Sequence, residues 1–299
     1  FDIDDRSSFE SKVLVSLFVQ QVIELVIVQI VSKYGIKKLI CSGGVFMNVK
    51  LNYLLSKCAD KICIMPLSGD QGAGLGLYQH FNRNLKWPDH LSIGLRDWDR
   101  PEKLEEVGNL EVFNDELEFV DEIIHELEST GYVNIVLGAM EFGPRALCNT
   151  STLAIPSTNN LEIINGLNNR TTVMPMAPVM TKDMARDYLT ANYQKFHKSL
   201  EYMVAACELR DDIESMDGAA HHYDSSWFEW MNKTCRPQII DHNDVIYQVV
   251  KHIGHPLINT SFNYHGQPIV YSEADIVESH SKQNEKGYIK TLVFTGEVK

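Results

Sequence analysis

The chain has 299 residues, 44% of them hydrophobic and 22% charged, and it carries a formal net charge of −13. A chain of this length and apolar content can bury ordinary cores and predicts about two domains, which excludes a largely disordered protein. The acidic balance also argues against a nucleic-acid surface, because neutralising phosphates requires clustered Lys and Arg that this sequence lacks.

The N-terminal segment predicts one long helix. Ser7 is placed to cap it, the apolar pattern continues to about Lys33, and Gly35 ends it. The apolar run at 14–31 approaches the length of a membrane span, but polar residues including Glu24 interrupt it. We therefore expect a buried helix of a soluble protein and no membrane partner.

A strand and a glycine turn follow this helix. A short buried strand is expected at 38–41, and it leads directly into Gly43 and Gly44 and then into a helix at 48–58. This order of strand, glycine turn and helix suits a nucleotide phosphate or ribose. A glycine pair alone is weak evidence, so the interpretation depends on the neighbouring motifs.

A second strand, expected at 61–65, ends shortly before Asp70 and a small-residue helix at 72–81. A carboxylate between a strand and a glycine-rich helix suits a metal held near nucleotide phosphates, while capping of the loop is the structural alternative. Both turns would follow strands of one parallel sheet. Asp70 is therefore expected beside the turn at Gly43 and Gly44.

Residues 82–114 resemble a linker with one short helix, which puts a domain boundary near residue 115. Beyond it, helical and strand patterns alternate, which indicates an α/β sheet domain. The expected helices lie at 116–129, 161–168, 183–189 and 244–253, and the expected strands lie at 132–137, at 201–206 and in the segment that ends near Asn259.

The loop after the strand at 132–137 contains the run Glu-Phe-Gly-Pro-Arg-Ala-Leu at 141–147. Its Gly-Pro turn is rigid enough to point Arg145 into a pocket, and Glu141 is placed to orient that side chain. A guanidinium beside small polar donors suits a small planar anion. The alternative is a surface arginine in an ordinary turn.

A second run, Ile-Asn-Thr-Ser-Phe-Asn at 258–263, joins an apolar strand entry to small polar donors. If the segment stays extended, Asn259, Ser261 and Asn263 share one face. A polar strand end is the alternative. Because each run alone has too few donors for an anion, we expect Arg145 and Ser261 to lie close together in space.

These two runs, together with Ser-Gly-Gly-Val-Phe-Met-Asn at 42–48 and Gly-Asp-Gln-Gly-Ala-Gly-Leu-Gly at 69–76, resemble those of the O-carbamoyltransferases of the nodulation and antibiotic-biosynthesis type. The motifs follow the family's order over nearly the whole chain. The resemblance implies an α/β fold: the second lobe of an actin-like (RNase H-like) domain with a linker in 1–114, then a YrdC-like α/β domain in 115–299. It also implies a first lobe supplied in cis or in trans.

The resemblance further implies a cytoplasmic enzyme that uses carbamoyl phosphate and ATP, via carbamoyl-adenylate, to carbamoylate a hydroxyl of a small molecule. The six cysteines show no CxxC spacing, which fits a reducing compartment. Carried over residue by residue, the resemblance implies that the nucleotide would touch Gly43, Gly44 and Asn48. A divalent metal, iron or magnesium, would bind Asp70 in a site that this chain alone leaves incomplete. Carbamoyl phosphate would be held by Arg145, Arg170, Arg236, Asn259, Ser261 and Asn263.

Several positions depart from the family pattern. Cys148 stands in place of a glycine, Thr150, Ser157 and Met174 replace arginines, and Trp230 stands about where a histidine is usual. Losing cations weakens an anion pocket, because hydrogen bonds to charged groups are the strong ones. Two alternatives therefore stay open: a non-catalytic nucleotide-binding or assembly subunit with a decayed pocket, and an adenylate-forming YrdC-like enzyme acting on another acyl donor.

Overall fold

The computed structural model describes residues 9–84, 90–94, 104, 107–170, 176–211, 213, 215–221, 233–240 and 245–296. Met174 and Trp230, two of the departures from the family pattern, lie outside the described residues. The N-terminal part contains α1 (Phe9–Lys33), β1 (Lys38–Cys41), η1 (Gly44–Met47), α2 (Val49–Cys58), β2 (Lys61–Ile64) and α3 (Gln71–Phe81).

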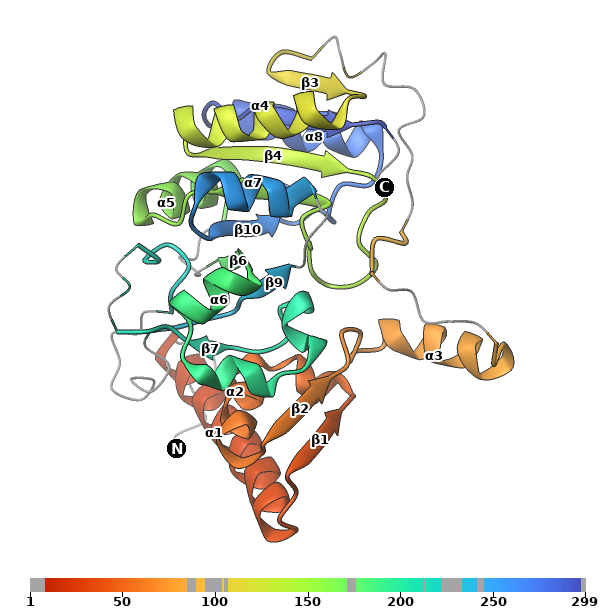
Figure 1. The fold of residues 1–299 in the computed structure, drawn as a ribbon, viewed down its shortest axis with the longest axis vertical. Helices are drawn as coiled ribbons and strands as arrows, with labels where there is room; N and C mark the ends of the chain where they lie inside the picture. Colours follow the sequence, from red (N-terminus) through yellow and green to blue (C-terminus); the bar gives the residue numbers. More distant parts are fainter. Residues whose placement is uncertain are drawn as a thin grey trace.

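This N-terminal part forms a small unit at the lower end of the molecule, from which α3 projects (Figure 1). β1 and β2 pair in parallel, as expected, with Cys41 opposite Ile64. Asn48 caps the N-terminus of α2, because its side chain accepts hydrogen bonds from the backbone amides of Lys50 and Leu51. The carboxyl ends of both strands therefore lie at one edge of the unit.

The long N-terminal helix is present, but its expected burial is wrong. Val31 is its only buried side chain among those described, although Ile23 and Ile27 pack partly against the core. Val15 and Leu25 are each 58% exposed. The reason is that the apolar side chains of α1 lie on all sides of the helix, whereas only one side packs against α2. The segment 11–33, with a mean hydropathy of 2.1, is long and apolar enough to cross a membrane by length and composition.

The larger part of the chain supplies most of the strands. Its elements are β3 (Leu110–Phe113), α4 (Glu116–Ser129), β4 (Tyr132–Leu137), β5 (Thr150–Ala154), α5 (Thr158–Leu167), β6 (Ala177–Thr181), α6 (Lys182–Tyr188), η3 (Ala191–Lys195), η4 (Lys198–Tyr202), β7 (Cys207–Glu208), β8 (Thr234–Cys235), β9 (Gln238–Ile240), α7 (Val245–Ile253), β10 (Leu257–Ser261), α8 (Glu273–Asn284) and β11 (Thr291–Phe294).

Seven of these strands form one mixed sheet in the order β3-β11-β4-β5-β10-β6-β9. The pairs from β4 through β5 and β10 to β6 are antiparallel, and the outer pairs are parallel. α4 and α7 cover one face, while α5 and α8 cover the other (Figure 1). The predicted α/β class is confirmed, and β10, which carries the second polar run, lies inside the sheet.

The strand expected at 201–206 is wrong. That segment is the end of η4 followed by a turn, and the short strand β7 begins only at Cys207. Met203 has a φ of 54°, a left-handed conformation that breaks an extended chain. The turn brings Val204 against α2, where the Val204 carbonyl accepts a hydrogen bond of 2.6 Å from Asn52 Nδ2. The two parts of the chain are joined there.

A buried histidine makes stability depend on pH. His280 of α8 hydrogen-bonds Thr291 Oγ1 through Nδ1 and the Gly108 carbonyl through Nε2, both at 2.8 Å. Burial lowers the pKa of His280 from its ordinary 6.5, although the Gly108 bond partly opposes this. The unfolded chain therefore takes up the proton first as pH falls, so this contribution to stability is present above 6.5 and declines below it.

We expect the free energy of unfolding in urea to decrease between about pH 7 and about pH 5.5, and to decrease less in His280→Gln. The matched control is His255→Gln, because His255, in the turn after α7, is only half-buried. An unchanged pH profile in His280→Gln would contradict the assignment.

Candidate functional site

The two polar runs meet at a cavity of about 340 Å³. It lies where the β4–β5 loop, the end of α5, the β8–β9 turn and β10 come together. Its lining residues are Pro144, Arg145, Ala146, Asn165, Arg170, Met176, Ala177, Met203, Arg236, Asn259, Thr260, Ser261 and His265. The structure thus brings Arg145 and Ser261 into one cavity, as expected, together with Arg170, Arg236 and Asn259.

The β4–β5 loop is held by Glu141, whose side chain is fully buried. Its Oε1 accepts hydrogen bonds from the amides of Leu147 and Asn149 at 2.7 Å and of Thr150 at 3.1 Å, and its Oε2 accepts one from Thr150 Oγ1 at 2.5 Å. The expectation that Glu141 orients Arg145 is therefore wrong. The Glu141 carboxylate accepts hydrogen bonds from backbone amides of the loop and so fixes the shape of the loop. It does not form an ion pair with the Arg145 guanidinium.

Arg170 is placed by neutral hydroxyls of β10. Its guanidinium donates to Thr260 Oγ1 at 2.9 Å and to Ser261 Oγ at 3.2 Å. Ser261 in turn donates to Asn263 Oδ1 at 2.5 Å, and Asn263 Nδ2 donates to the Gln267 carbonyl at 2.9 Å. Asn263 lies beyond the end of β10 at Ser261 and does not line the cavity. Its side chain instead accepts the hydrogen bond from Ser261, which does line the cavity.

Among the described residues, no neighbouring carboxylate balances the positive charge in the cavity. Burial lowers the pKa of Arg145 and of Arg170. Burial, followed by the nearby charge of Arg145, lowers the pKa of Arg236 to about 9. In the part of the chain that the structure describes, no carboxylate oxygen lies within 4.0 Å of these three groups. A bound anion would relieve this repulsion and accept charge-assisted hydrogen bonds.

Asn259 lies in the wall of the cavity and is 2% exposed. Its Nδ2 donates to the Ala146 carbonyl at 3.1 Å and to Gln238 Oε1 at 2.7 Å, and it contacts Cys148 Sγ at 3.1 Å. Cys148 has a φ of 74°. Glycine adopts that left-handed conformation without a steric penalty, so the backbone at Cys148 is in a conformation that would be less strained with glycine.

Two of the other departures have local structural roles in this chain. Thr150 is buried and bonds Glu141. Ser157 caps α5, because its hydroxyl accepts from the Asn160 amide at 3.1 Å. Neither lines the cavity. The cavity therefore keeps three cations although the arginines expected at 150 and 157 are absent.

The nucleotide and metal motifs lie outside this cavity. Gly43 has a φ of 109°, which only glycine adopts readily. The side chain of Asn48 is occupied by capping α2 and by a hydrogen bond of 2.6 Å to Gln20. A Cβ at Gly69 would lie 2.9 Å from Met47 Sδ, so the two turns are neighbours. The role of these residues toward a nucleotide stays a prediction.

Asp70 is exposed, and its side chain makes no capping hydrogen bond to α3. Within the described ranges, no group of three or more His, Cys, Asp or Glu side chains is placed to hold a metal ion. A lone carboxylate does not make an iron site, and it holds magnesium only together with substrate phosphates and water. The described residues therefore do not by themselves complete the implied metal site.

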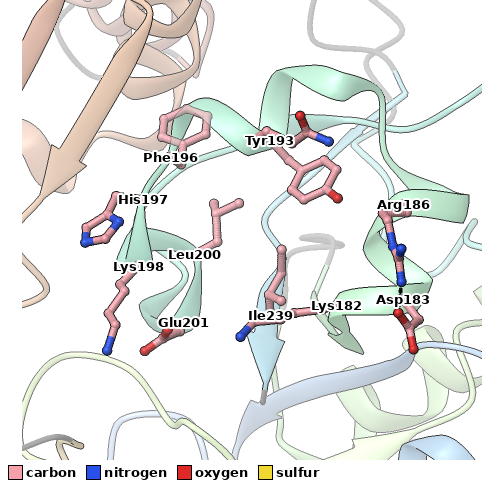
Figure 2. A pocket seen from close by; sticks show the side chains of 11 residues that line it. Lys182, Asp183, Arg186, Tyr193, Phe196, His197, Lys198, Leu200, Glu201 and Ile239 are labelled. Carbon is pink, nitrogen blue, oxygen red and sulfur yellow. Dashed lines mark hydrogen bonds and ion pairs between the residues drawn. The ribbon is translucent and has the colours of Figure 1, made fainter. Parts of the chain in front are cut away.

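A larger cavity, of about 550 Å³, lies between α6, β9 and the segment with η3 and η4 (Figure 2). Phe196, Leu200 and Ile239 form a buried apolar floor. Arg186 on its rim is exposed and paired with Asp183. None of the predicted site residues lines it, so the motifs converge on the smaller cavity.

Sequence reasoning missed Asn165, Thr260 and His265 in the cavity wall. Asn165 is 6% exposed and lies one turn before Arg170, whose amide donates to the Asn165 carbonyl at 2.8 Å. In the sequence, Asn165 looks like any asparagine within a predicted helix, so nothing marks it as a site residue. Only the fold shows that the end of α5 faces β10.

The turn that carries Arg145 requires glycine. Gly143 has a φ of 136°, and a Cβ there would lie 2.8 Å from Leu67 Cδ2. We expect Gly143→Ala to lower the free energy of unfolding by about 1–3 kcal/mol and to weaken anion binding, because Arg145 moves with the loop. Urea denaturation and calorimetric titration with phosphate measure the two effects.

The control is Gly74→Ala in α3, where no atom lies within 4 Å of an added Cβ. This change should leave anion binding unchanged and stabilise the helix by about 0.5–1 kcal/mol. Equal effects of the two substitutions would show that the turn at Gly143 has no special requirement.

Comparison with known proteins gives consistent matches. The family described as Carbamoyltransferase C-terminus matches residues 124–294. The uncharacterized protein MJ1051 of Methanocaldococcus jannaschii is 34% identical over 311 residues, covering 94% of this chain and 56% of that protein. Nodulation protein NolNO of Sinorhizobium fredii is 30% identical over 275 residues, covering 81% and 37%. The chain thus spans 56% and 37% of these curated relatives.

Among solved structures, full-length HypF in its phosphate- and nucleotide-bound form overlaps 57% of this chain and 21% of its own, with a TM-score of 0.39 and 10% identity.

Proposed function

The chain belongs to the carbamoyltransferase family defined by this C-terminal region, and from that premise we propose that its smaller cavity binds carbamoyl phosphate for reaction with ATP. The product would be carbamoyl-adenylate, from which the carbamoyl group passes to a hydroxyl of a small molecule. The observation that carries this proposal is the set of three guanidiniums, Arg145, Arg170 and Arg236, around one cavity without a carboxylate partner in the described chain.

The proposed reaction has two stages, formation of carbamoyl-adenylate and transfer of its carbamoyl group. Water releases phosphate from carbamoyl phosphate and leaves carbamate, one oxygen of which attacks the α-phosphorus of ATP while the bond to pyrophosphate breaks. The acceptor hydroxyl then attacks the carbonyl carbon of carbamoyl-adenylate, loses its proton to solvent and releases AMP. The arginines would stabilise the negative charge that accumulates on the phosphoryl and carboxylate oxygens.

The whole reaction is proposed for the complete gene product, because the relatives are longer than this chain. The nucleotide is proposed to contact the turn at Gly43 and Gly44 through backbone atoms, since capping occupies the Asn48 side chain. No step is assigned to a metal. All six cysteines are free thiols, which agrees with the cytoplasmic location that we propose.

Exchange of labelled pyrophosphate into ATP tests the adenylate step without knowledge of the acceptor. We expect exchange that requires carbamoyl phosphate, is lost in Arg236→Ala and is retained in Arg186→Ala, whose guanidinium lies at the other cavity. Carbamoyl-phosphate binding without exchange would contradict the adenylate step. Exchange that depends on another acyl donor would favour the adenylate-forming YrdC-like enzyme.

A non-catalytic subunit with a decayed pocket is the second candidate, and it rests on the departures from the resembled pattern at Cys148, Thr150 and Ser157, although neither Thr150 nor Ser157 lines the cavity. It predicts that the complete wild-type protein binds no carbamoyl phosphate at millimolar concentration. Substitution of Arg145, Arg170 or Arg236 would then alter stability alone.

A further inference from the structure

We propose that Asn52 couples the glycine turn at Gly43 and Gly44 to the smaller cavity, so that a ligand at either place raises the affinity for a ligand at the other. Asn52 is a positioning residue, because its side chain is fully buried in α2 and touches neither ligand. The inference rests on the proposed function, and it adds a link between the two places where that function puts its ligands.

The Asn52 side chain joins two segments that are far apart in the sequence. Its Nδ2 donates to the Phe46 carbonyl at 2.7 Å and to the Val204 carbonyl at 2.6 Å. A side-chain amide nitrogen carries two hydrogens, so each carbonyl takes one of them. Asn52 Oδ1 is buried without a hydrogen-bond partner among the described residues. The amide is therefore held by its two donor contacts, which form a bridge between the segments.

One end of this bridge is the glycine turn. Phe46 belongs to η1, which follows Gly43 directly. The Phe46 amide donates to the Gly43 carbonyl at 2.9 Å. Because this short helix is closed by hydrogen bonds between residues three apart, it leaves little slack between the turn and the Phe46 carbonyl. A ligand that moves Gly43 therefore also moves the carbonyl that Asn52 holds.

The other end is the wall of the smaller cavity. Val204 follows Met203, which lines that cavity and has a left-handed φ of 54°. Such a conformation is uncommon for a residue other than glycine and persists only where neighbouring contacts hold it. The hydrogen bond from Asn52 to the next carbonyl is one such contact. A shift of Val204 therefore changes the position of Met203 in the cavity wall.

The helix that carries Asn52 also reaches the segment of Arg236. Tyr53 and Lys57 of α2 donate to Glu208 Oε1, the lysine at 2.5 Å. Glu208 lies in β7 opposite Thr234 of β8, and Arg236 follows β8 and lines the cavity. α2 thus holds two neighbouring parts of the cavity wall, so a displacement of this helix changes both.

Two ligands measure the coupling. AMP probes the glycine turn, and phosphonoacetamide, which carries a phosphonate and a carbamoyl group, probes the smaller cavity. In calorimetric titrations of the complete gene product, we expect saturating AMP to tighten phosphonoacetamide binding by at least about fivefold. The reason is that the first ligand already fixes the bridge, so the second does not have to order it. Because linkage is reciprocal, saturating phosphonoacetamide should tighten AMP binding by the same factor.

Two substitutions of Asn52 should remove the coupling. Asn52→Leu has no donor for either carbonyl, so AMP should change phosphonoacetamide affinity by less than about twofold. Asn52→Ser keeps one O–H, which serves one carbonyl but cannot bridge two, so it should lose the coupling as well. The serine variant gives the answer if the leucine variant does not fold. Inorganic phosphate alone should bind both variants almost as it binds wild type, because the three arginines remain.

Asn192→Ala is the matched control. Asn192 Nδ2 donates to Ser56 Oγ of α2 at 2.5 Å, so this substitution also removes a side-chain amide contact between the two parts of the chain. Asn192 lies in η3, however, and does not line the smaller cavity. The control should keep the coupling of wild type. An equal loss in Asn192→Ala would show that general loosening of α2 causes the effect, and it would overturn the role of Asn52.

Failure of the inference and failure of the proposed function give different results. If wild type does not bind phosphonoacetamide, the proposed function fails and the inference fails with it. If both ligands bind but neither tightens the other, or if AMP weakens phosphonoacetamide binding by competing for the arginines, the cavity is still an anion site and the coupling is overturned. Coupling of wild-type size in both Asn52 variants would also overturn it.

Discussion

Arg236→Ala is expected to weaken carbamoyl-phosphate binding by about 1.5–3 kcal/mol, or about 10- to 150-fold, because it removes charge-assisted hydrogen bonds to the bound anion. The free energy of unfolding of the unliganded protein, in contrast, should stay the same or rise slightly. Arg236 is held beside Arg145 without a carboxylate partner in the described chain, and its pKa is lowered to about 9. The free protein should therefore unfold at an equal or slightly higher urea concentration after the substitution.

This combination of lost binding and retained stability distinguishes a ligand-binding arginine from a structural one. The control is Arg186→Ala, which removes an exposed guanidinium paired with Asp183 at the larger cavity. It should leave the affinity unchanged. Affinity lost equally in both variants would point to a general electrostatic effect, and destabilisation by Arg236→Ala would indicate a structural role.

Glu141→Ala is expected to destabilise the protein by about 3–5 kcal/mol, the largest effect that we predict on folding. The substitution leaves three backbone amides, one buried and two partly buried, without their acceptor and creates a cavity beneath the β4–β5 loop. Because that loop carries Arg145, any folded fraction should also bind carbamoyl phosphate more weakly. Urea denaturation gives the first effect and titration of the folded protein gives the second.

Glu141→Gln separates charge from geometry. Its side-chain oxygen can still accept from the three amides, and its NH₂ can donate to Thr150 Oγ1, so a smaller loss of about 1–2 kcal/mol is expected. Glu118→Ala, at an exposed position in α4, should change stability by less than about 0.5 kcal/mol. Equal destabilisation by Ala and Gln at position 141 would contradict the role of the carboxylate as an acceptor of amide hydrogen bonds.

Local patterns predicted the elements that local interactions determine. The helix expected at 116–129 matches α4, because its amphipathic pattern begins at Asp115, which caps it through the amides of Leu117 and Glu118. The strand expected at 132–137 matches β4. The segment 201–206 failed because a left-handed residue, Met203, turns a chain whose apolar composition is typical of a strand.

The site residues likewise fall into those that local motifs predicted and those that only the fold brings into the site. Arg145 and Ser261 were predictable as partners because each run lacked donors, and the fold joins them through the pairing of β5 with β10. Asn165 was not predictable, since its importance depends on α5 packing near the end of β10. The burial of α1 was predicted wrongly, because burial depends on what lies beside a helix and composition does not specify that.

A crystal structure of the complete gene product with phosphonoacetamide, a stable analogue of carbamoyl phosphate, would show whether the three arginines form the anion site. We expect the ligand in the smaller cavity, with phosphonate oxygens about 2.7–3.2 Å from nitrogen atoms of Arg145, Arg170 and Arg236. Phosphonoacetamide bound instead at the larger cavity beside Lys182 and Arg186, or bound away from the three arginines, would contradict the proposed anion site.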